Sequence, residues 1–278
     1  MQRILLLKDK TRNDTTNNTA YVDPYEKELS SRNYISVFIP VLEHALLNVP
    51  RLSDLLKKGS ISKYWGVIVT SQRAVETLRT AWNEVVSELT ADTILWWNNI
   101  PFFVVGKATA KAVSELNFMP VGAEHSGNAD LLADYIVSYY AQNKPDLENQ
   151  STKLLFLVGD KRRDVIPKRM SQEGIGVDEL LVYETRPNEQ FEALLKDALD
   201  SGKPFDCVVF FSPSGVGITI ESLCKWKVIP NAKVAAIGPT TANHLQGQMQ
   251  IKVDAVAKKP DAASLAEAIN GCNSIVID

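Results

Sequence analysis

The sequence contains little cysteine and little histidine. Three residues of each kind occur in 278, at widely separated positions: Cys207, Cys224, Cys272, His44, His125 and His244. The cysteines form no CxxC pair, so we expect reduced thiols without a redox or metal role rather than a disulfide framework. The histidines lack the spacing of metal ligands and are expected to be ordinary surface or core residues. No metal site is predicted.

A large charge of one sign and long apolar runs are also missing. Thirty basic residues against 33 acidic ones give a formal net charge of −3, without the basic excess typical of nucleic-acid-binding proteins. The apolar run near the N-terminus is too short for a signal peptide, and no stretch approaches the length of a membrane span. We therefore expect a cytoplasmic protein that binds neither nucleic acid nor membrane. No apolar stripe demands a partner chain, so we expect a monomer.

The familiar cofactor motifs are incomplete. Residues 215–220 have the first two glycines of a dinucleotide-binding fingerprint, but Ile220 replaces the third. Gly106-Lys107-Ala108-Thr109 lacks the earlier glycine of a P-loop. No nucleophile elbow and no acidic metal-binding cluster occur either. These absences argue against a nucleotide or nicotinamide enzyme, and we expect no cofactor.

Buried strands alternate with helices along the whole chain. Apolar runs typical of parallel strands lie at 4–7, 35–39, 66–70, 102–105, 154–158, 179–183, 207–211 and 234–237. Helical periodicity lies at 24–32, 72–90, 107–117, 128–141, 162–173, 189–200, 214–225, 240–246 and 262–270. This alternation predicts a doubly wound α/β fold.

Two strand-turn-helix motifs each occur twice, in the same order. Residues 67–76 match 208–216, and residues 104–110 match 236–242. Such a repeat indicates duplicated halves that form two similar parallel-sheet domains, with a ligand cleft shared by both.

The order of the duplicated segments predicts an interleaved domain layout. Residues 43–181 would form one domain, and residues 1–38 would complete a second domain with residues 185–278. The chain would cross between them at 39–42 and 182–186, which we expect to form a two-stranded hinge.

The repeated turns are candidate anion-binding sites. Ligands of open α/β sheets bind beyond the carboxyl ends of the strands, where helix N-termini present unpaired N–H groups. The residues that follow the strands there are Ser71, Gly106, Thr109, Ser212, Gly238 and Thr241. Glycine lets the backbone approach an anion, and the hydroxyls can donate hydrogen bonds. The serine and threonine residues could instead only cap their own helices.

An ordered set of motifs carries a family resemblance along essentially the full length. The set comprises Ile-Leu-Leu-Leu-Lys-Asp (4–9), Asp-Pro-Tyr (23–25), Ile-Pro-Val-Leu (39–42), Thr-Ser-Gln-Arg-Ala-Val-Glu (70–76), Val-Val-Gly-Lys-Ala-Thr-Ala (104–110), Ser-Gly-Asn-Ala (126–129), Phe-Phe-Ser-Pro-Ser-Gly (210–215) and Ala-Ala-Ile-Gly-Pro-Thr-Thr-Ala (235–242). In this order it resembles eukaryotic uroporphyrinogen-III synthases. The chief departures are the polar segment 11–20 and the segment 82–99.

The resemblance implies a cofactor-free lyase of tetrapyrrole synthesis with two α/β domains. Its substrate would be hydroxymethylbilane, a linear tetrapyrrole with eight carboxylates, which it would close to uroporphyrinogen III with loss of water. Tyr183 matches the family's candidate proton donor, although it could simply pack at the hinge. By the same matching, Arg73 and Lys233 join the six turn residues as substrate contacts. Arg73 could instead form a surface ion pair, and Lys233 could merely flank a strand.

A second interpretation belongs to another class of protein. Two similar α/β lobes with two crossings also describe a clamshell that closes on an anion without chemistry. Turnover of the linear tetrapyrrole discriminates between the two.

Overall fold

The computed structural model describes residues 1–11, 22–59, 64–143 and 153–273. The polar segment expected at 11–20 lies outside the described residues from residue 12 onward. The chain divides into two compact units: unit 1 comprises Met1–Glu43 with Arg186–Asp278, and unit 2 comprises His44–Thr185.

Unit 1 is built on a five-stranded sheet, sheet A. Its strands are β1 (Gln2–Leu6), β2 (Tyr34–Phe38), β9 (Cys207–Phe210), β10 (Lys233–Ala236) and β11 (Ala255–Val256). Their order is β11-β10-β9-β1-β2, and every neighbouring pair is parallel. The N-terminal strand β1 therefore lies between β2 and β9, with Ile4 opposite Cys207.

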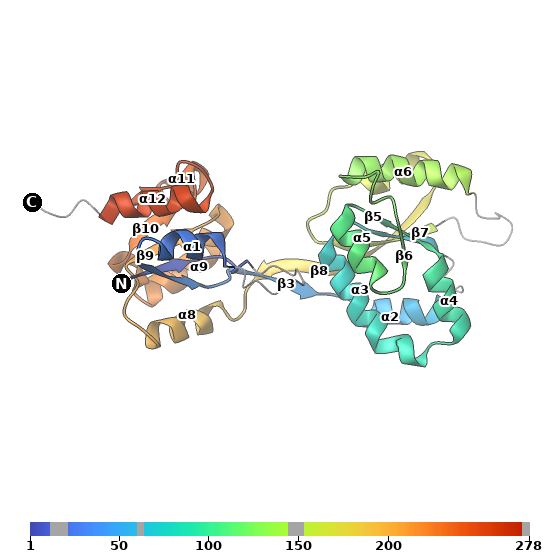
Figure 1. Ribbon diagram of the computed structural model, residues 1–278, viewed down its shortest axis with the longest axis horizontal. Helices are drawn as coiled ribbons and strands as arrows, with labels where there is room; N and C mark the ends of the chain where they lie inside the picture. The colour runs from blue at the N-terminus through green and yellow to red at the C-terminus, as the bar shows by residue number, and fades with distance from the viewer. Residues whose placement is uncertain (12–21, 60–63, 144–152, 274–278) are drawn as a thin grey trace, which may run out of the picture. The chain divides into compact units, whose positions relative to one another are not determined.

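Helices cover both faces of sheet A. The helices of unit 1 are α1 (Pro24–Ser30), α8 (Phe191–Asp200), α9 (Pro213–Lys225), α10 (Val228–Asn231), α11 (Pro239–Gly247) and α12 (Ala262–Asn273). Leu195 of α8 and Val216 of α9 share a buried cluster with Leu5 of β1. Leu29 of α1 and Leu265 of α12 belong to the cluster on the other face. In Figure 1, α8 and α12 lie on opposite sides of these strands.

Unit 2 is built on a six-stranded sheet, sheet B. Its strands are β3 (Leu42–Leu46), β4 (Tyr64–Val69), β5 (Pro101–Val104), β6 (Met119–Val121), β7 (Lys153–Gly159) and β8 (Gly176–Pro187). Their order is β3-β8-β7-β4-β5-β6, and the pairs from β8 to β6 are parallel.

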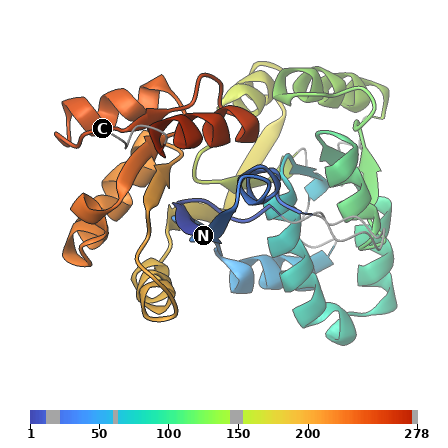
Figure 2. The same cartoon turned by 60° about the vertical axis from the view of Figure 1, so that its left-hand side comes forward.

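Sheet B also has helices on both faces. They are α2 (Val49–Lys58), α3 (Gln72–Val85), α4 (Ala91–Asn99), α5 (Lys107–Ser114), α6 (Ala129–Gln142) and α7 (Val165–Gln172). Helices α2 to α5 contribute to one buried cluster, whereas α6 and α7 contribute to the other. Figure 1 shows α6 on one side of the strands and α2 on the other, and the turned view in Figure 2 shows the same layering.

The two sheets repeat one topology. Reading from one edge, β11-β10-β9-β1-β2 corresponds strand by strand to β6-β5-β4-β7-β8, and β3 is added beside β8. The two units are therefore duplicated versions of one doubly wound α/β arrangement, which confirms the predicted fold class. Each sheet combines segments that are far apart in the chain.

Two strands carry the chain between the units. The unit boundaries fall within or beside β3 and β8, which are neighbours in sheet B. The amide of Leu47 donates to the carbonyl of Val182 at 2.8 Å, and the amide of Asn188 donates to the carbonyl of Val41 at 2.9 Å. Segments 39–42 and 182–186, where the sequence predicts the crossings, overlap or adjoin these strands.

Candidate functional site

Each sheet has a topological switch point. In sheet B, the chain runs from β4 through β5 to β6 and then returns to place β7 on the other side of β4. The helices that follow β4 and β7 cover opposite faces, and doubly wound folds bind ligands beyond the carboxyl ends of such a strand pair. In sheet A, the corresponding pair is β9 and β1.

Tyr183 lies at the switch point of unit 2. The β7–β8 register shifts so that Gly159, the last residue of β7, lies opposite Tyr183. Val182 and Tyr183 both pack toward the α3 face, as expected at a bulge, which can re-aim a side chain. A Cβ atom built on Gly159 would lie 2.6 Å from Cε2 and 2.6 Å from Oη of Tyr183. The phenol therefore covers the backbone of Gly159 at the carboxyl edge.

The backbone around Tyr183 is held on two sides. Oγ1 of Thr77 in α3 donates to the carbonyl of Val182 at 2.8 Å, and the amide of Asp160 donates to the carbonyl of Tyr183 at 3.2 Å. The side chain is half-buried, and its hydroxyl forms no hydrogen bond within the described residues. The backbone at Tyr183 is thus held in place, and within the described residues its phenol O–H is left without a hydrogen-bond partner.

Ser71 and Arg73 lie at the start of α3, after β4. Ser71 Oγ accepts from the amide of Ala74 at 3.2 Å, so it is the helix N-cap, and its own proton stays available for donation. Arg73 pairs with Glu76 through one nitrogen, with Nη1 lying 2.9 and 3.0 Å from the two carboxylate oxygens. Both side chains of this pair are exposed. Arg73 therefore forms a surface ion pair, which is one of the two alternatives that the sequence allows.

Helix α5 begins without a side-chain cap. Gly106 has φ 76° and ψ 155°, a conformation that favours glycine, and a Cβ there would have nothing within 4 Å. In the described part of the chain, the amides of the first three helical residues, 107–109, have no protein acceptor. Thr109, the third of them, is buried. This helix start is open to an anion.

The switch point of unit 1 repeats this pattern. Ser212 Oγ accepts from the amide of Gly215 at 3.0 Å and caps α9, as Ser71 caps α3. Helix α11 begins at Gly238 without a side-chain cap, its Pro239 has no N–H, and the described residues offer no acceptor to the amides of Thr240 and Thr241. Thr241 is buried at the third helical position, as Thr109 is. In each unit, therefore, the helix after the first repeated turn is capped by a serine, and the helix after the second repeated turn begins without a side-chain cap.

Lys233 does not lie at the carboxyl edge of either sheet. It is the first residue of β10, at the amino end of the strand, whereas Gly238 lies beyond the carboxyl end. Its Nζ donates to the carbonyl of Cys272 at 2.8 Å. This position matches the strand-flanking alternative for Lys233.

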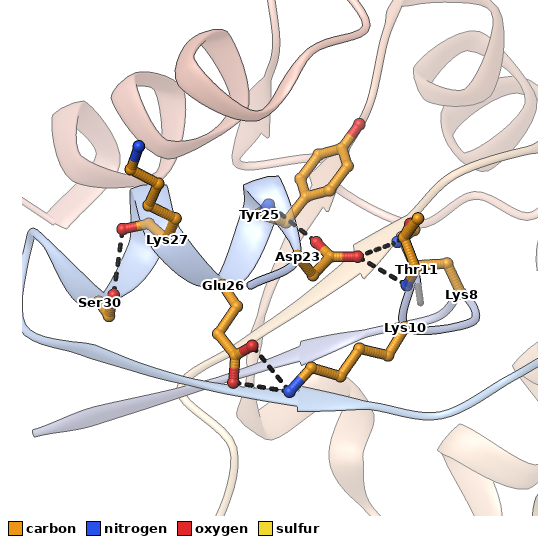
Figure 3. Close-up of polar contacts among 8 residues, drawn as sticks. All are labelled: Lys8, Lys10, Thr11, Asp23, Tyr25, Glu26, Lys27 and Ser30. Carbon is orange, nitrogen blue, oxygen red and sulfur yellow. Dashed lines mark hydrogen bonds and ion pairs between the residues drawn. The ribbon is translucent and has the colours of Figure 1, made fainter. Parts of the chain in front are cut away.

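Sequence reasoning missed a cation at the switch point of unit 1. Lys8 follows β1 as Ser212 follows β9, and its Nζ lies 2.9 Å from Oδ2 of Asp23, a residue with no exposed surface. Figure 3 shows this ion pair beside the start of α1, where Asp23 also accepts from the amides of Thr11 and Tyr25. The sequence did contain a signal for this cation, because Lys8 directly follows the apolar run 4–7.

The described residues contain no group of three His, Cys, Asp or Glu side chains arranged to hold a metal ion. Within the same residues, no helix is both long enough and apolar enough to span a bilayer.

Comparison with known proteins identifies the family. The family model described as uroporphyrinogen-III synthase HemD matches residues 23–267. A uroporphyrinogen-III synthase from Schizosaccharomyces pombe is 34% identical over 97% of this chain and 96% of its own length. One from Saccharomyces cerevisiae is 32% identical, over 96% and 95% respectively. A crystal structure of uroporphyrinogen-III synthetase from Helicobacter pylori covers 98% of this chain and 99% of its own, at 17% identity and a TM-score of 0.47. The family match and the two yeast relatives show that the chain belongs to the uroporphyrinogen-III synthase family.

Proposed function

We propose that this chain closes hydroxymethylbilane to uroporphyrinogen III, with loss of water and inversion of the terminal ring D through a spiro intermediate. The observation that carries the proposal is the Tyr183 phenol over Gly159, at the switch point of a chain of this family. The reaction needs a leaving hydroxyl to depart and a ring carbon to attack at the right place. The protein meets both requirements mainly by holding the reacting groups in the right positions.

Tyr183 is the proposed proton donor. As the C–O bond of the hydroxymethyl group breaks, the phenol proton passes to the departing oxygen and water leaves. The remaining cation is delocalised over an electron-rich pyrrole, so modest assistance suffices. The substituted carbon of ring D attacks it to give the spiro compound, which reopens and closes again with ring D inverted. Loss of a proton from the newly joined ring carbon restores aromaticity and can return a proton to Tyr183.

The helix starts are the proposed carboxylate-binding groups. At α5 and α11 the open amides supply N–H donors and the positive end of the helix dipole, which bind carboxylates without a basic surface. Gly106 and Gly238 leave room for the ligand, and Thr109 and Thr241 are the third residues of their helices, within the first turn. The hydroxyls of Ser71 and Ser212 can each donate one more hydrogen bond.

The two predicted cations have smaller parts in this proposal. Nη1 of Arg73 is engaged by exposed Glu76, so a substrate carboxylate would bind its remaining N–H donors or compete with Glu76. Lys233 is left out of the proposed site because it lies at the amino end of β10.

Isomer analysis tests the proposed activity. Purified protein, treated with a chelator and given freshly generated hydroxymethylbilane, should yield the type III isomer in excess of the type I isomer that forms without an enzyme. Only type I product would overturn the proposal. Boiled protein and a no-protein sample are the controls.

The proposal also includes a cytoplasmic monomer that does not bind nucleic acid. The near-balanced charge of the chain supports the last point, because sequence-independent nucleic-acid binding relies on a basic surface. Light scattering across a range of protein concentrations tests the monomer.

A further inference from the structure

The substrate carries many carboxylates, but neither of the two cations predicted to meet them lies at the carboxyl edge of sheet A. Arg73 belongs to unit 2, where its Nη1 pairs with Glu76, and Lys233 donates to a backbone carbonyl at the amino end of its strand. The carboxyl edge of sheet A nevertheless holds a lysine. Lys8 follows β1, which pairs with β9, and Ser212 follows β9. Lys8 and Ser212 therefore flank the switch point of unit 1.

Asp23 holds Lys8 in place. The carboxylate has no exposed surface and accepts three hydrogen bonds, from Lys8 Nζ at 2.9 Å, the amide of Thr11 at 2.9 Å and the amide of Tyr25 at 2.8 Å. Burial alone would raise the pKa of Asp23, but these hydrogen bonds outweigh it and leave the pKa below its ordinary value. Asp23 is therefore a fixed anion that pins one side of the ammonium group.

Among the described residues, the Lys8 ammonium group keeps a donor for a further acceptor. An ammonium has three N–H donors, and Asp23 takes one. The contact with Oγ1 of Thr11 is long, at 3.5 Å, so it holds a second donor weakly at most. The Lys8 side chain is 20% exposed and lies over the rings of Tyr25 and Phe38, at 5.1 and 5.2 Å from their centroids. The distances are those of the ammonium nitrogen, so both rings make cation–π contacts that help to hold the charged group in place.

We infer that Lys8, positioned by Asp23, is the cation through which unit 1 binds a substrate carboxylate. The inference rests on the proposed function, because it assigns a residue to the recognition of that polycarboxylate substrate. Lys8 is a binding residue and Asp23 a positioning residue. Neither is assigned a part in the proton transfer.

The test uses a double variant, Lys8→Met with Asp23→Asn. Removing Lys8 alone would leave the buried carboxylate without its partner and weaken the fold. The double variant removes both charges, and the asparagine side chain introduced by Asp23→Asn can still cap α1 by accepting from the amide of Tyr25. Lys10→Met is the matched control, because Lys10 is a nearby exposed lysine whose Nζ pairs with Glu26 at 2.7 Å.

Steady-state kinetics with hydroxymethylbilane give the decisive comparison. Loss of one charge-assisted hydrogen bond should raise KM about 10-fold in the double variant and change kcat less than about 2-fold. The dependence of KM on salt should become shallower, whereas Lys10→Met should shift KM by less than about 2-fold. The single variant Asp23→Asn, which keeps the cation but loosens it, should give an intermediate KM and a lower Tm.

The possible results separate the inference from the proposed function. Wild-type KM and salt dependence in the double variant would overturn the role of Lys8, as would an equal rise of KM in Lys10→Met. A wild-type protein that yields no type III product would instead overturn the proposed function itself.

Discussion

Replacing Gly159 with alanine should displace the phenol on which the proposed chemistry depends. The added Cβ would lie 2.6 Å from both Cε2 and Oη of Tyr183, whereas carbon atoms in contact lie about 3.5–4.0 Å apart. The ring must therefore move by about 1 Å. Gly159 has no positive φ, so the backbone itself accepts alanine and the steric contact is the main effect.

A displacement of this size should reduce turnover more than stability. Misplacing a reacting group by about 1 Å can lower the rate about 100-fold, and we expect kcat to fall about 10-fold to 100-fold in Gly159→Ala. Overpacking of a partly buried side chain typically destabilises by about 1–3 kcal/mol, which corresponds to a Tm lowered by several degrees. Stopped-time isomer assays and thermal melts measure the two effects separately. Gly271→Ala in α12, where an added Cβ meets nothing within 4 Å, is the control: it should leave kcat unchanged and, because alanine favours a helix more than glycine does, should not lower Tm.

A double-mutant cycle tells whether the effect runs through the hydroxyl of Tyr183. If it does, Gly159→Ala combined with Tyr183→Phe should be no slower than Tyr183→Phe alone. Wild-type kcat in Gly159→Ala, or rate losses that multiply in the double variant, would refute the reasoning.

Three further predictions concern the fold and the ionisable groups. Residues 44–185 should fold alone with a cooperative thermal transition, whereas residues 186–278 alone should not, because sheet A would lack β1 and β2. A cooperative thermal transition of the C-terminal fragment would contradict this prediction. Because its pKa is lowered in the folded state, Asp23 should stabilise the protein above about pH 4 and lose this contribution as the pH falls through the folded-state pKa. The Tm difference between wild type and Asp23→Asn should therefore shrink on acidification from about pH 6 to about pH 3, and a difference independent of pH would argue against the ion pair. Burial raises the pKa of Cys207 to about 12, so a thiol reagent at about pH 8 should label exposed Cys224 first and Cys207 only after unfolding; rapid native labelling of Cys207 would show that the core is open.

The main strands of the fold could be predicted because they are buried on both faces. The apolar runs at 4–7, 154–158 and 207–211 became β1, β7 and β9 with small shifts at their ends. The strands that were missed lie at sheet edges: β3 is partly polar, and β6 and β11 are only three and two residues long. Edge strands carry a weak apolar signal, because one side of the strand lacks a neighbour.

The segment 82–99, which departs from the pattern of the family, is held in the fold by tertiary contacts. Its last part forms α4, and Trp97 of this helix is fully buried. The indole Nε1 of Trp97 donates to the carbonyl of Leu56 at 2.8 Å, which ties α4 to the end of α2. The Trp96-Trp97 pair was visible in the sequence, but its partner α2 was not predicted.

The candidate site was predictable where it follows from the strand-turn-helix pattern. The turns at Ser71, Gly106, Ser212 and Gly238 lie at the carboxyl edges because parallel strands all end there. Side-chain pairing was not predictable, because it depends on neighbours in space. Arg73 and Lys8 are both basic residues near strand ends, and only the structure shows that Lys8 rather than Arg73 lies over a buried carboxylate.

The kinetics of Tyr183→Phe test the central claim most directly. This substitution removes the phenol O–H and keeps the ring that packs over Gly159, so it separates proton donation from packing. The account predicts that kcat for type III product falls about 10-fold to 100-fold while Tm stays within about 2 °C of wild type. Wild-type turnover at unchanged Tm would contradict it, and would leave substrate positioning by the helix starts as the whole mechanism.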